Sequence, residues 1–258
     1  MTEGQFQIIR AVAFALAVAF AFALQRRLPH APMRGSYRVN LVLWGINLAV
    51  LGGVCGACAC TISRWAAVHH LGILHVWDVP PWFALPMTIV GLDSVSYLWH
   101  RANHRVAVLW RFHRVHHSDL SFTVSTGVRF HPGELLLSLP LRLTAIVLLG
   151  APIVAVVMFE VLFTVANLIE HGNINFHPGL ERWLARLLVT PALHRRHHMR
   201  RRPELDSNFG TIFTVWDRLL GTYGESSSAL QIEVGLPGQQ QALPLRTALA
   251  MPFVGVRD

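Results

Sequence analysis

The sequence contains no lysine, so all of its positive side-chain charge comes from 22 arginines. With 14 acidic residues, its formal net charge is +8. A strongly basic chain can bind nucleic acid when its lysines and arginines gather on one face. We attribute the arginine excess instead to genome composition and to membrane topology, and we expect no nucleic-acid partner.

Charged residues of both signs are scarce. Only 14% of the chain is charged, whereas 53% is hydrophobic. Ordinary soluble domains carry about 25% charged residues, so this composition excludes an ordinary soluble domain. A helix needs about 20 mainly apolar residues to cross a bilayer, and the chain contains several apolar runs near that length. We therefore predict an all-α, integral membrane helical protein.

Cysteines are few, and two common catalytic motifs are missing. Cys55, Cys58 and Cys60 fall in one apolar run and have no partner cysteine elsewhere, so we assign them to helix packing rather than to a metal or a disulfide. No GxGxxG follows a strand-like segment, which leaves no nicotinamide or flavin site. No HExxH is present, which excludes the general-base glutamate of that class of zinc hydrolase.

Four apolar segments are expected to enter the membrane. The first lacks a basic segment in front of it, so we interpret it as a retained helix rather than a signal peptide. Gly150 and Pro152 divide the last into a helical hairpin. The segments are Ile8 to Leu24, Val39 to Cys60, Trp82 to Trp99 and Leu135 to Glu170.

Arginines are distributed unevenly between the loops. The loop between the first two segments carries four, whereas residues 61–80 carry only Arg64. Positive residues favour the cytoplasmic side, so we place the first loop in the cytoplasm and the N-terminus and residues 61–80 outside. The later crossings then return the chain to the cytoplasm, where we expect a histidine-rich helical cap. Such a chain would lie in a bacterial inner membrane.

Histidines recur at helical spacing. Residues three and four apart share one face of a helix, so each group can direct several imidazoles at one point. Adjacent histidines diverge by about 100° at 3.6 residues per turn, so one helix can serve two metal ions. The groups are His100 and His104 in HRANH, His113, His116 and His117 in HRVHH, and His194, His197 and His198 in HRRHH.

Two further histidines, His171 and His177 in HGNINFH, bring the set to ten. Imidazole suits iron, zinc, copper and nickel, and it is the commonest metal ligand in proteins. Ten imidazoles suffice for two ions at about five each, with a position left open for dioxygen or water. A single pair would more simply be a solvated helix face, but three groups at metal spacing favour a metal site.

An acidic residue lies inside the third apolar run. Asp93 shares a helical face with His100 and His104, and an ionisable residue within a membrane helix is a candidate functional residue. The alternative is a polar contact with another helix. Other acids near the histidine groups, including Glu134, Glu170 and Asp217, could accept the second N–H of a metal-bound histidine.

Taken in order, several motifs resemble those of the fatty acid hydroxylase/sterol desaturase superfamily. The resemblance extends from Asp93 to about Tyr223. It implies an integral membrane enzyme with a histidine-ligated di-iron centre on the cytoplasmic face. Such enzymes use dioxygen and two electrons to hydroxylate, desaturate or oxidise an unactivated C–H bond of a lipid. The motifs are HRANH, HRVHH, RFHP, HGNINFH, HRRHH and DSNFGTIFTVWDRLLGTY.

The resemblance implies that all ten histidines are metal ligands. His131 matches the HP motif, either as a ligand or behind the ligands. We take it, together with Asp93, Asn208 and Asp217, as a candidate catalytic residue. The implied ligands are His100, His104, His113, His116, His117, His171, His177, His194, His197 and His198.

The resemblance also implies two iron ions, which zinc can replace in overexpressed protein, and dioxygen as cosubstrate. Electrons are expected from a separate donor such as a ferredoxin or a reductase. We expect N-terminal membrane helices and an external loop in residues 1–80 and the catalytic domain in residues 81–225. Residues 226–258 form a tail to which we assign no chemistry.

A membrane metal-transport or metal-binding protein without oxygenase activity is the alternative. Transport sites lie near the bilayer midplane on broken helices, whereas these histidines lie at or beyond the ends of the apolar runs, which favours the enzyme. The motifs distinguish neither hydroxylation from desaturation nor one lipid from another.

Overall fold

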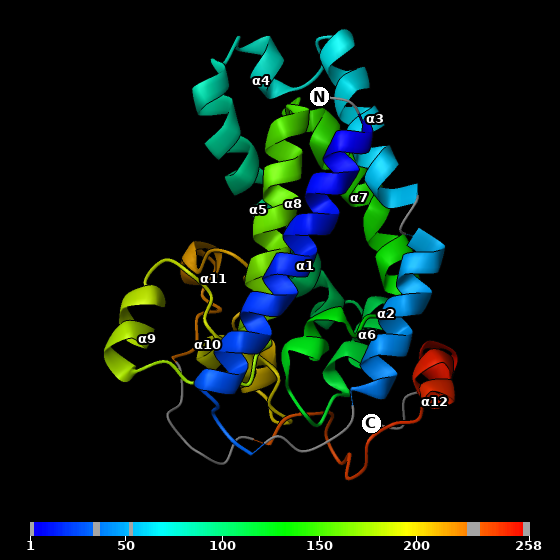
Figure 1. Ribbon diagram of the computed structural model, residues 1–258, viewed down its shortest axis with the longest axis vertical. Coiled ribbons are helices and arrows are strands. Elements are labelled where there is room, and N and C mark those ends of the chain that lie inside the picture. The colour runs from blue at the N-terminus through cyan, green and yellow to red at the C-terminus, as the bar shows by residue number, and fades with distance from the viewer. Residues whose placement is uncertain (1–2, 33–36, 52–53, 226–232, 255–258) are drawn as a thin grey trace.

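The computed structural model describes residues 3–32, 37–51, 54–225 and 233–254. Within these ranges the chain is helical, with isolated β-bridges and no β-strand, which confirms the all-α prediction. Long helices form a bundle in the upper part of Figure 1, and short helices and loops form a cap at its lower end.

Three helices are long and apolar enough to cross a membrane: α1 (Glu3–Arg27), α7 (Pro132–Leu149) and α8 (Ile153–Glu170). Large apolar side chains such as Leu16 and Leu148 are exposed on their outer faces. Such surfaces are stable against lipid rather than water. The protein is therefore a membrane protein, and the first and last predicted segments are confirmed as long apolar helices.

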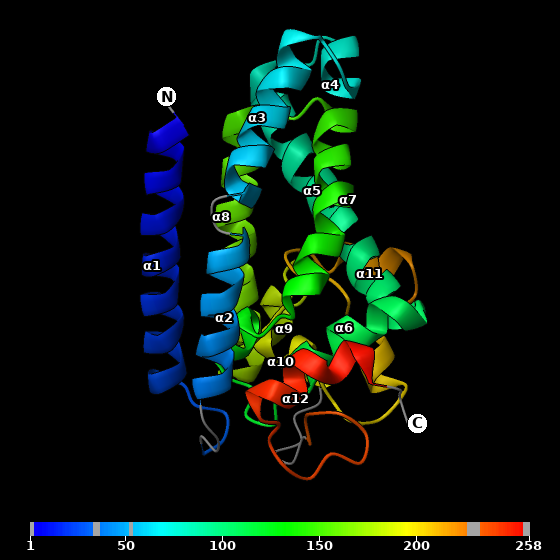
Figure 2. The same cartoon turned by 90° about the vertical axis from the view of Figure 1, so that its right-hand side faces the viewer.

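The third predicted segment lies within α5 (Pro81–Arg105), which continues beyond Trp99 and carries His100 and His104 on the same helix. The segment Cys58–Val76 meets α5 at a bend of 88°, and the two together are long and apolar enough for one broken crossing. The continuous helix α5 therefore runs from the membrane bundle into the histidine-rich cap (Figure 2).

The second predicted segment, Val39 to Cys60, is not a single helix, and this expectation was wrong. α2 (Arg38–Leu51) ends and α3 (Val54–Val68) begins inside it. α3 also extends into residues 61–80, which were predicted to form an external loop. Cys60, Ser63 and Ala66 are buried at three-residue spacing, so they share one packed face of this helix. A short helix, α4 (Ile73–Val76), follows.

The cysteines of α3 show no disulfide among the described residues. Cys58 and Cys60 are free thiols, while the side chain of Cys55 lies outside the described residues. The buried Cys60 packs near Phe6 and Val157, which agrees with a packing role for that residue.

Gly150 forms the turn between α7 and α8. It adopts the left-handed conformation, with φ of +68°. A Cβ atom at this position would lie 2.5 Å from the carbonyl oxygen of Leu71, so glycine allows the loop after α3 to approach the turn closely. The predicted break of the last apolar segment is confirmed.

A charged cluster connects three helices inside the bundle. Nε and Nη2 of Arg10 on α1 both lie 2.5 Å from Oε2 of Glu160 on α8. Nη2 of Arg142 on α7 lies 3.9 Å from Oε1 of the same glutamate. Charges are costly within a membrane and are normally paired, so this cluster favours one arrangement of α1, α7 and α8.

The cap is built from short helices that follow the long ones (Figure 2). They are α6 (Ala107–His117), η1 (Val124–Val128), α9 (Pro178–Leu184), α10 (Pro191–His197), η2 (Glu204–Asp206), α11 (Val215–Leu219), α12 (Leu245–Ala250) and η3 (Met251–Phe253).

A buried polar network holds the end of α6 against α2. Arg129 donates to the carbonyl oxygen of Val115 at 2.9 Å, to Oδ1 of Asn40 at 2.7 Å and to Oγ of Ser118 at 2.9 Å. Asn40 in turn donates to Asp119 at 2.7 Å. Buried polar groups are stable only when they are paired in this way, so the network fixes the end of the helix that carries HRVHH.

The C-terminal tail packs against the cap. Ala248 and Met251 form an apolar cluster with Leu43 of α2 and Val115 of α6. Arg114 on α6 donates to the carbonyl oxygens of Met251 and Val254. The described part of residues 226–258 thus covers α6. The division of the chain into the three predicted regions stays a prediction.

Candidate metal centre

Five imidazoles from three helices form the first histidine group. Their nearest ligand atoms all lie within 4.8 Å of one another. α5 and α6 each supply two of them and α10 supplies the fifth. The members are His100, His104, His113, His117 and His197.

Four imidazoles form the second group, again within 4.8 Å of one another. His116 comes from α6, His171 follows the last residue of α8, and His194 and His198 lie on and directly after α10. All four side chains are buried. Helices far apart in the sequence thus meet at two adjacent points.

The two groups divide each adjacent histidine pair. His116 and His198 belong to the second group, whereas their neighbours His117 and His197 belong to the first. Adjacent residues point about 100° apart on a helix. The second histidine of the α6 pair and the first histidine of the α10 pair therefore meet in one group, and the other two meet in the second group. One turn of α6 and one turn of α10 therefore serve both groups.

Ring nitrogens of the first group lack protein partners. The Nε2 atoms of all five histidines are buried and have no hydrogen-bond partner within the described residues. Buried polar atoms are normally satisfied. Five unpaired nitrogens directed at one point are the arrangement that a metal ion requires, so the donor set fits a bound transition-metal ion.

The second group shows close approaches between ring nitrogens. Nε2 of His171 lies 2.9 Å from Nε2 of His116 and 2.9 Å from Nε2 of His194. Nitrogens bound at 2.0–2.1 Å to one ion at near right angles lie about 3 Å apart. The spacing of this group therefore also fits a shared metal ion.

Burial lowers the pKa of eight of the nine grouped imidazoles. Desolvation, followed by the neighbouring imidazoles, lowers the pKa of His117 and His198 well below its ordinary value. Burial also lowers the pKa of His171 to about 4 and that of His197 to about 3. Metal ions bind the neutral ring, so the cap presents the correct protonation state for metal binding at pH 7.

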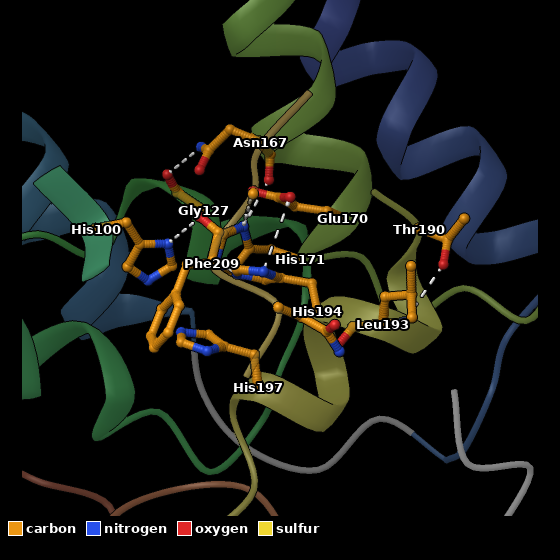
Figure 3. A network of polar contacts seen from close by, with 12 residues as sticks. His100, Gly127, Asn167, Glu170, His171, Thr190, Leu193, His194, His197 and Phe209 are labelled. Carbon is orange, nitrogen blue, oxygen red and sulfur yellow. Dashed lines mark hydrogen bonds and ion pairs between the residues drawn. The ribbon is translucent and has the colours of Figure 1, made fainter. Parts of the chain in front are cut away.

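Backbone carbonyls orient several of the rings (Figure 3). Nδ1 of His100 donates to Phe209 at 2.9 Å, and Nδ1 of His171 donates to Asn167 at 2.6 Å. Nδ1 of His197 donates to the carbonyl oxygen of Ser207 at 2.7 Å. A donor bond at Nδ1 leaves Nε2 as the lone-pair nitrogen. The sequence pattern carries no sign of these carbonyl partners.

Two buried carboxylates lie against the groups. Oε1 of Glu134 is 2.8 Å from Nδ1 of His113. Glu170 lies between two imidazoles of the second group, 3.7 Å from Nδ1 of His171 and 3.8 Å from Nδ1 of His194. The sequence suggested these glutamates only as members of a larger set of acids, and their place beside the rings comes from the fold.

His131 and His177 lie outside both groups. His131 caps α7: its Nδ1 accepts from the backbone N–H of Gly133 at 2.9 Å, and its Nε2 donates to the carbonyl oxygen of Leu249 at 3.2 Å. His177 is exposed and caps α9 through Gly179. Both ring nitrogens of His131 are thus occupied by the protein, and we leave both residues out of the proposed ligand set.

Asp93 holds the segment before α11 against α5. Its carboxylate accepts from the backbone N–H groups of Ile212 and Phe213 at 3.2 and 3.3 Å and from Nε1 of Trp216 at 2.8 Å. The contact with Trp216 on α11 corresponds to the alternative considered from the sequence, a polar contact with another helix.

Asp217 and Asn208 shape the loop that contacts His100. Asp217 accepts from the backbone N–H groups of Phe209 and Gly210, each at 2.8 Å. Asn208 has a φ of +54° and donates to the carbonyl oxygen of Leu193 at 3.1 Å. Because Phe209 accepts the hydrogen bond from His100, both residues support the orientation of a ring without facing the groups themselves.

A cavity of about 180 Å³ reaches both groups. Its polar end is lined by imidazoles of both groups, among them His100 and His171. Its other walls come from apolar residues of α5, α7 and α8, including Val95, Leu141 and Phe163. The cavity therefore connects the histidines to the helices of the membrane bundle.

Comparison with known proteins places these features in a family. The family model for fatty acid hydroxylase matches residues 85–222. The ornithine lipid hydroxylase OlsE of Rhizobium tropici is 31% identical over 196 residues, which cover 75% of this chain and 57% of that protein. The alkylglycerol monooxygenase of Homo sapiens is 30% identical over 149 residues, 57% of this chain and 32% of that protein.

A third relative, the very-long-chain aldehyde decarbonylase GL1-5 of Oryza sativa subsp. indica, is 32% identical over 181 residues, covering 62% of this chain and 28% of that protein. The aligned part thus takes in less than two thirds of each of these relatives. No solved structure shows a significant match. The matched residues 85–222 contain all nine grouped histidines and span more than half of the chain, and the chain belongs to the fatty acid hydroxylase family.

Proposed function

We propose that the protein is a membrane-bound di-iron oxygenase that uses dioxygen and two electrons to hydroxylate, desaturate or oxidise a C–H bond of a lipid. The observation that carries this proposal is the pair of buried histidine groups at the end of a cavity walled by apolar helices. The family membership and the lipid-modifying relatives support it.

The nine grouped histidines would hold two iron ions, five imidazoles on one and four on the other. Bound iron would supply the chemistry that activates dioxygen. The protein's own part is to present neutral, oriented rings. Glu134 and the carbonyl oxygens of Phe209, Asn167 and Ser207 fix the Nδ1 protons, and such partners preserve ligand orientation and metal affinity.

The cavity would bind the hydrocarbon part of the substrate. Side chains such as Leu92, Val95, Phe159 and Phe163 line it, and apolar walls favour an alkyl chain over water. His100 and His113 of the first group and His116 and His171 of the second reach the same space. A lipid chain lying there would place one carbon beside both groups.

Three further parts of the proposal rest on the sequence. Electrons would come from a separate donor such as a ferredoxin or a reductase, which the arginine-rich cap could attract. The arginine asymmetry of the loops favours a cap on the cytoplasmic face. We take the membrane to be the inner membrane of a bacterium, and zinc to be a substitute for iron in overexpressed protein.

Lipid extracts of cells with and without the gene, compared by mass spectrometry, would test this function. A lipid that gains one oxygen atom supports hydroxylation, and one that loses two hydrogen atoms supports desaturation. The control is a variant with His113→Ala and His116→Ala, which removes one ring from each group. The oxygenase proposal is wrong if the lipids are the same in cells with the native chain, with the control variant and without the gene, although the purified native chain contains two metal ions. A metal-binding role would then be favoured.

A further inference from the structure

The cap exposes a set of large apolar side chains outside the long membrane helices. We call this set the α9–α11 patch. Trp183 is 64% exposed, and Leu187 and Leu219 are each 70% exposed. Single exposed apolar residues are normal, but a contiguous set marks an interaction surface. The patch consists of Leu180, Trp183, Leu187, Val215, Leu219 and Leu220.

Hydrogen bonds join the two halves of the patch. The backbone N–H of Thr214 donates to the carbonyl oxygen of Leu187 at 3.0 Å. Nη2 of Arg218 donates to the carbonyl oxygen of Ala185, also at 3.0 Å. These bonds hold the loop after α9 beside the start of α11, so the apolar side chains of the two segments form one surface.

The polarity of α9 is the reverse of that of a helix on a water-exposed surface. Its acidic residue Glu181 points inward, is buried, and accepts a hydrogen bond from Oγ1 of Thr190. Leu180 and Trp183 lie on the exposed side of α9, and Leu187 is exposed in the loop that follows it. A helix that faces water normally buries its apolar side and exposes its charges, so the outer face of α9 is suited to a less polar medium.

Arginines accompany this apolar face. Arg182 on α9 and Arg186 in the loop that follows are exposed, and the guanidinium of Arg218 lies 3.8 Å from the centre of the Tyr223 ring. Apolar and aromatic side chains with nearby arginines are typical of segments that lie in the headgroup region of a bilayer. Basic residues there are attracted to anionic lipid phosphates.

The α9–α11 patch lies at the same level along the long axis of the molecule as part of the helix bundle. In Figure 1, α9 and α11 lie at the height of the lower half of α1, and neither lies beyond its lower end. Figure 2 keeps the same vertical axis and shows α11 at the same height. Since α1 is long and apolar enough to cross the membrane, the patch lies level with the part of α1 nearer the histidine groups.

We propose that the α9–α11 patch inserts into the lipid headgroup region on the membrane face that holds the histidine groups. Trp183, Leu187 and Leu219 contact acyl chains there, while Arg182 and Arg186 contact the phosphates of anionic lipids. The inference concerns the membrane contact of the cap and does not depend on the metal or on the reaction.

Nitroxide labels in the full chain test the insertion. Cys55, Cys58 and Cys60 are first changed to alanine, and the chain is placed in lipid nanodiscs. Labels at Leu187→Cys and Leu219→Cys should collide with dissolved oxygen several-fold more, and with a neutral water-soluble nickel chelate several-fold less, than a label at Gln241→Cys. Gln241 is an exposed residue of the tail, and far-ultraviolet circular dichroism verifies that each variant is folded. Equal access of the chelate to all three labels would overturn the proposal.

The same labelled variants test the preference for anionic lipid. They also test the competing possibility that the patch binds a protein partner. Nanodiscs with phosphatidylglycerol should move the Leu187 label deeper than nanodiscs of phosphatidylcholine alone, and Arg182→Gln with Arg186→Gln should remove the difference. If the Leu187 label of the parent chain lies at the same depth in both kinds of nanodisc, the contact with anionic lipids is overturned. If the labels are open to water in nanodiscs and become protected when an acidic ferredoxin is added, the patch is a protein-docking surface and the membrane proposal fails.

Discussion

Oε1 of Glu134 lies 2.8 Å from Nδ1 of His113, and both side chains are buried. Asn103 donates to the same oxygen at 3.2 Å. The glutamate belongs to the first turn of α7, so this contact connects a membrane helix to the first histidine group. It leaves Nε2 of His113 directed at the other rings of that group.

Changing Glu134 to leucine should therefore weaken metal binding. Removing the partner of a ligand histidine lowers metal affinity by about 10- to 100-fold. The measurement is metal retained per chain during titration with a competing chelator. Glu134→Gln retains an acceptor oxygen and should lose less, and Ser138→Ala, one turn further along α7, should retain the native affinity. Native affinity in Glu134→Leu would show that the contact does not position His113.

His198→Ala should abolish turnover while leaving the protein in the membrane, because packing of the long helices does not depend on one cap imidazole. Arg196→Ala, about 200° away around the helix, should retain the chemistry and at most weaken donor docking, an effect that added salt would mimic. Product formed per folded chain at saturating donor compares them. Normal activity in His198→Ala together with lost activity in Arg196→Ala would contradict the ligand assignment on α10.

Purified protein never exposed to chelator should contain close to two metal ions per chain, with iron as the native metal. Removing them should lower the thermal unfolding midpoint, because a ligand that binds only the folded state stabilises it. Elemental analysis and thermal unfolding before chelation, after it and after reloading with Fe²⁺ check this. Folded, chelator-free protein without any metal would refute it.

Acidification should loosen the cap that His131 forms at the start of α7. Burial lowers the pKa of His131 below its ordinary value, and only the neutral ring accepts at Nδ1 from Gly133. A lowered folded-state pKa contributes stability that is fully present above the unfolded value of about 6.5 and is lost as the pH falls through the folded value. The unfolding midpoint should therefore fall on acidification below pH 6.5.

His131→Asn provides the control, since asparagine also caps helices but does not titrate. Other buried imidazoles contribute to the same acid dependence in both proteins, so the comparison isolates His131. The midpoint of the variant, followed by near-ultraviolet circular dichroism between pH 7.5 and 5, should fall less steeply than that of the native chain. Identical slopes would exclude a contribution from His131.

The orientation in the membrane is also open to measurement. Reporter fusions after residues 35, 70 and 225 should report cytoplasm, exterior and cytoplasm, respectively, because of the arginine asymmetry. A fusion after residue 225 that is active only in the periplasm would reverse the predicted topology.

Helical spacing predicted much of the site. The repeated HxxHH pattern indicated two metals on shared helices because residue spacing fixes direction on a helix, and the structure divides His116 from His117 as that rule requires. Spacing could not exclude His177 from the ligand set. Whether a histidine caps a helix, as His177 does, or faces a metal depends on tertiary contacts that the sequence does not show.

Partners set by the tertiary fold could not be predicted. The carbonyl of Asn167 that accepts from His171, and that of Phe209 that accepts from His100, are backbone atoms that every residue has. The predicted span from Val39 to Cys60 was wrong because continuous hydrophobicity does not show where one helix ends and another begins. Asp93 was singled out as an acidic residue within a membrane helix, and only the fold shows that it binds the backbone before α11 and Trp216 on α11.

His116 and His117, and likewise His197 and His198, connect the two groups through a single peptide unit. Consecutive Cα atoms are held 3.80 Å apart by covalent geometry, so the backbone acts as a spacer of fixed length between the two sites. A displacement of α6 or α10 carries ligands of both sites together. The separation of the two groups is therefore set in part by the covalent backbone of these two histidine pairs, and not only by the packing of the helices against one another.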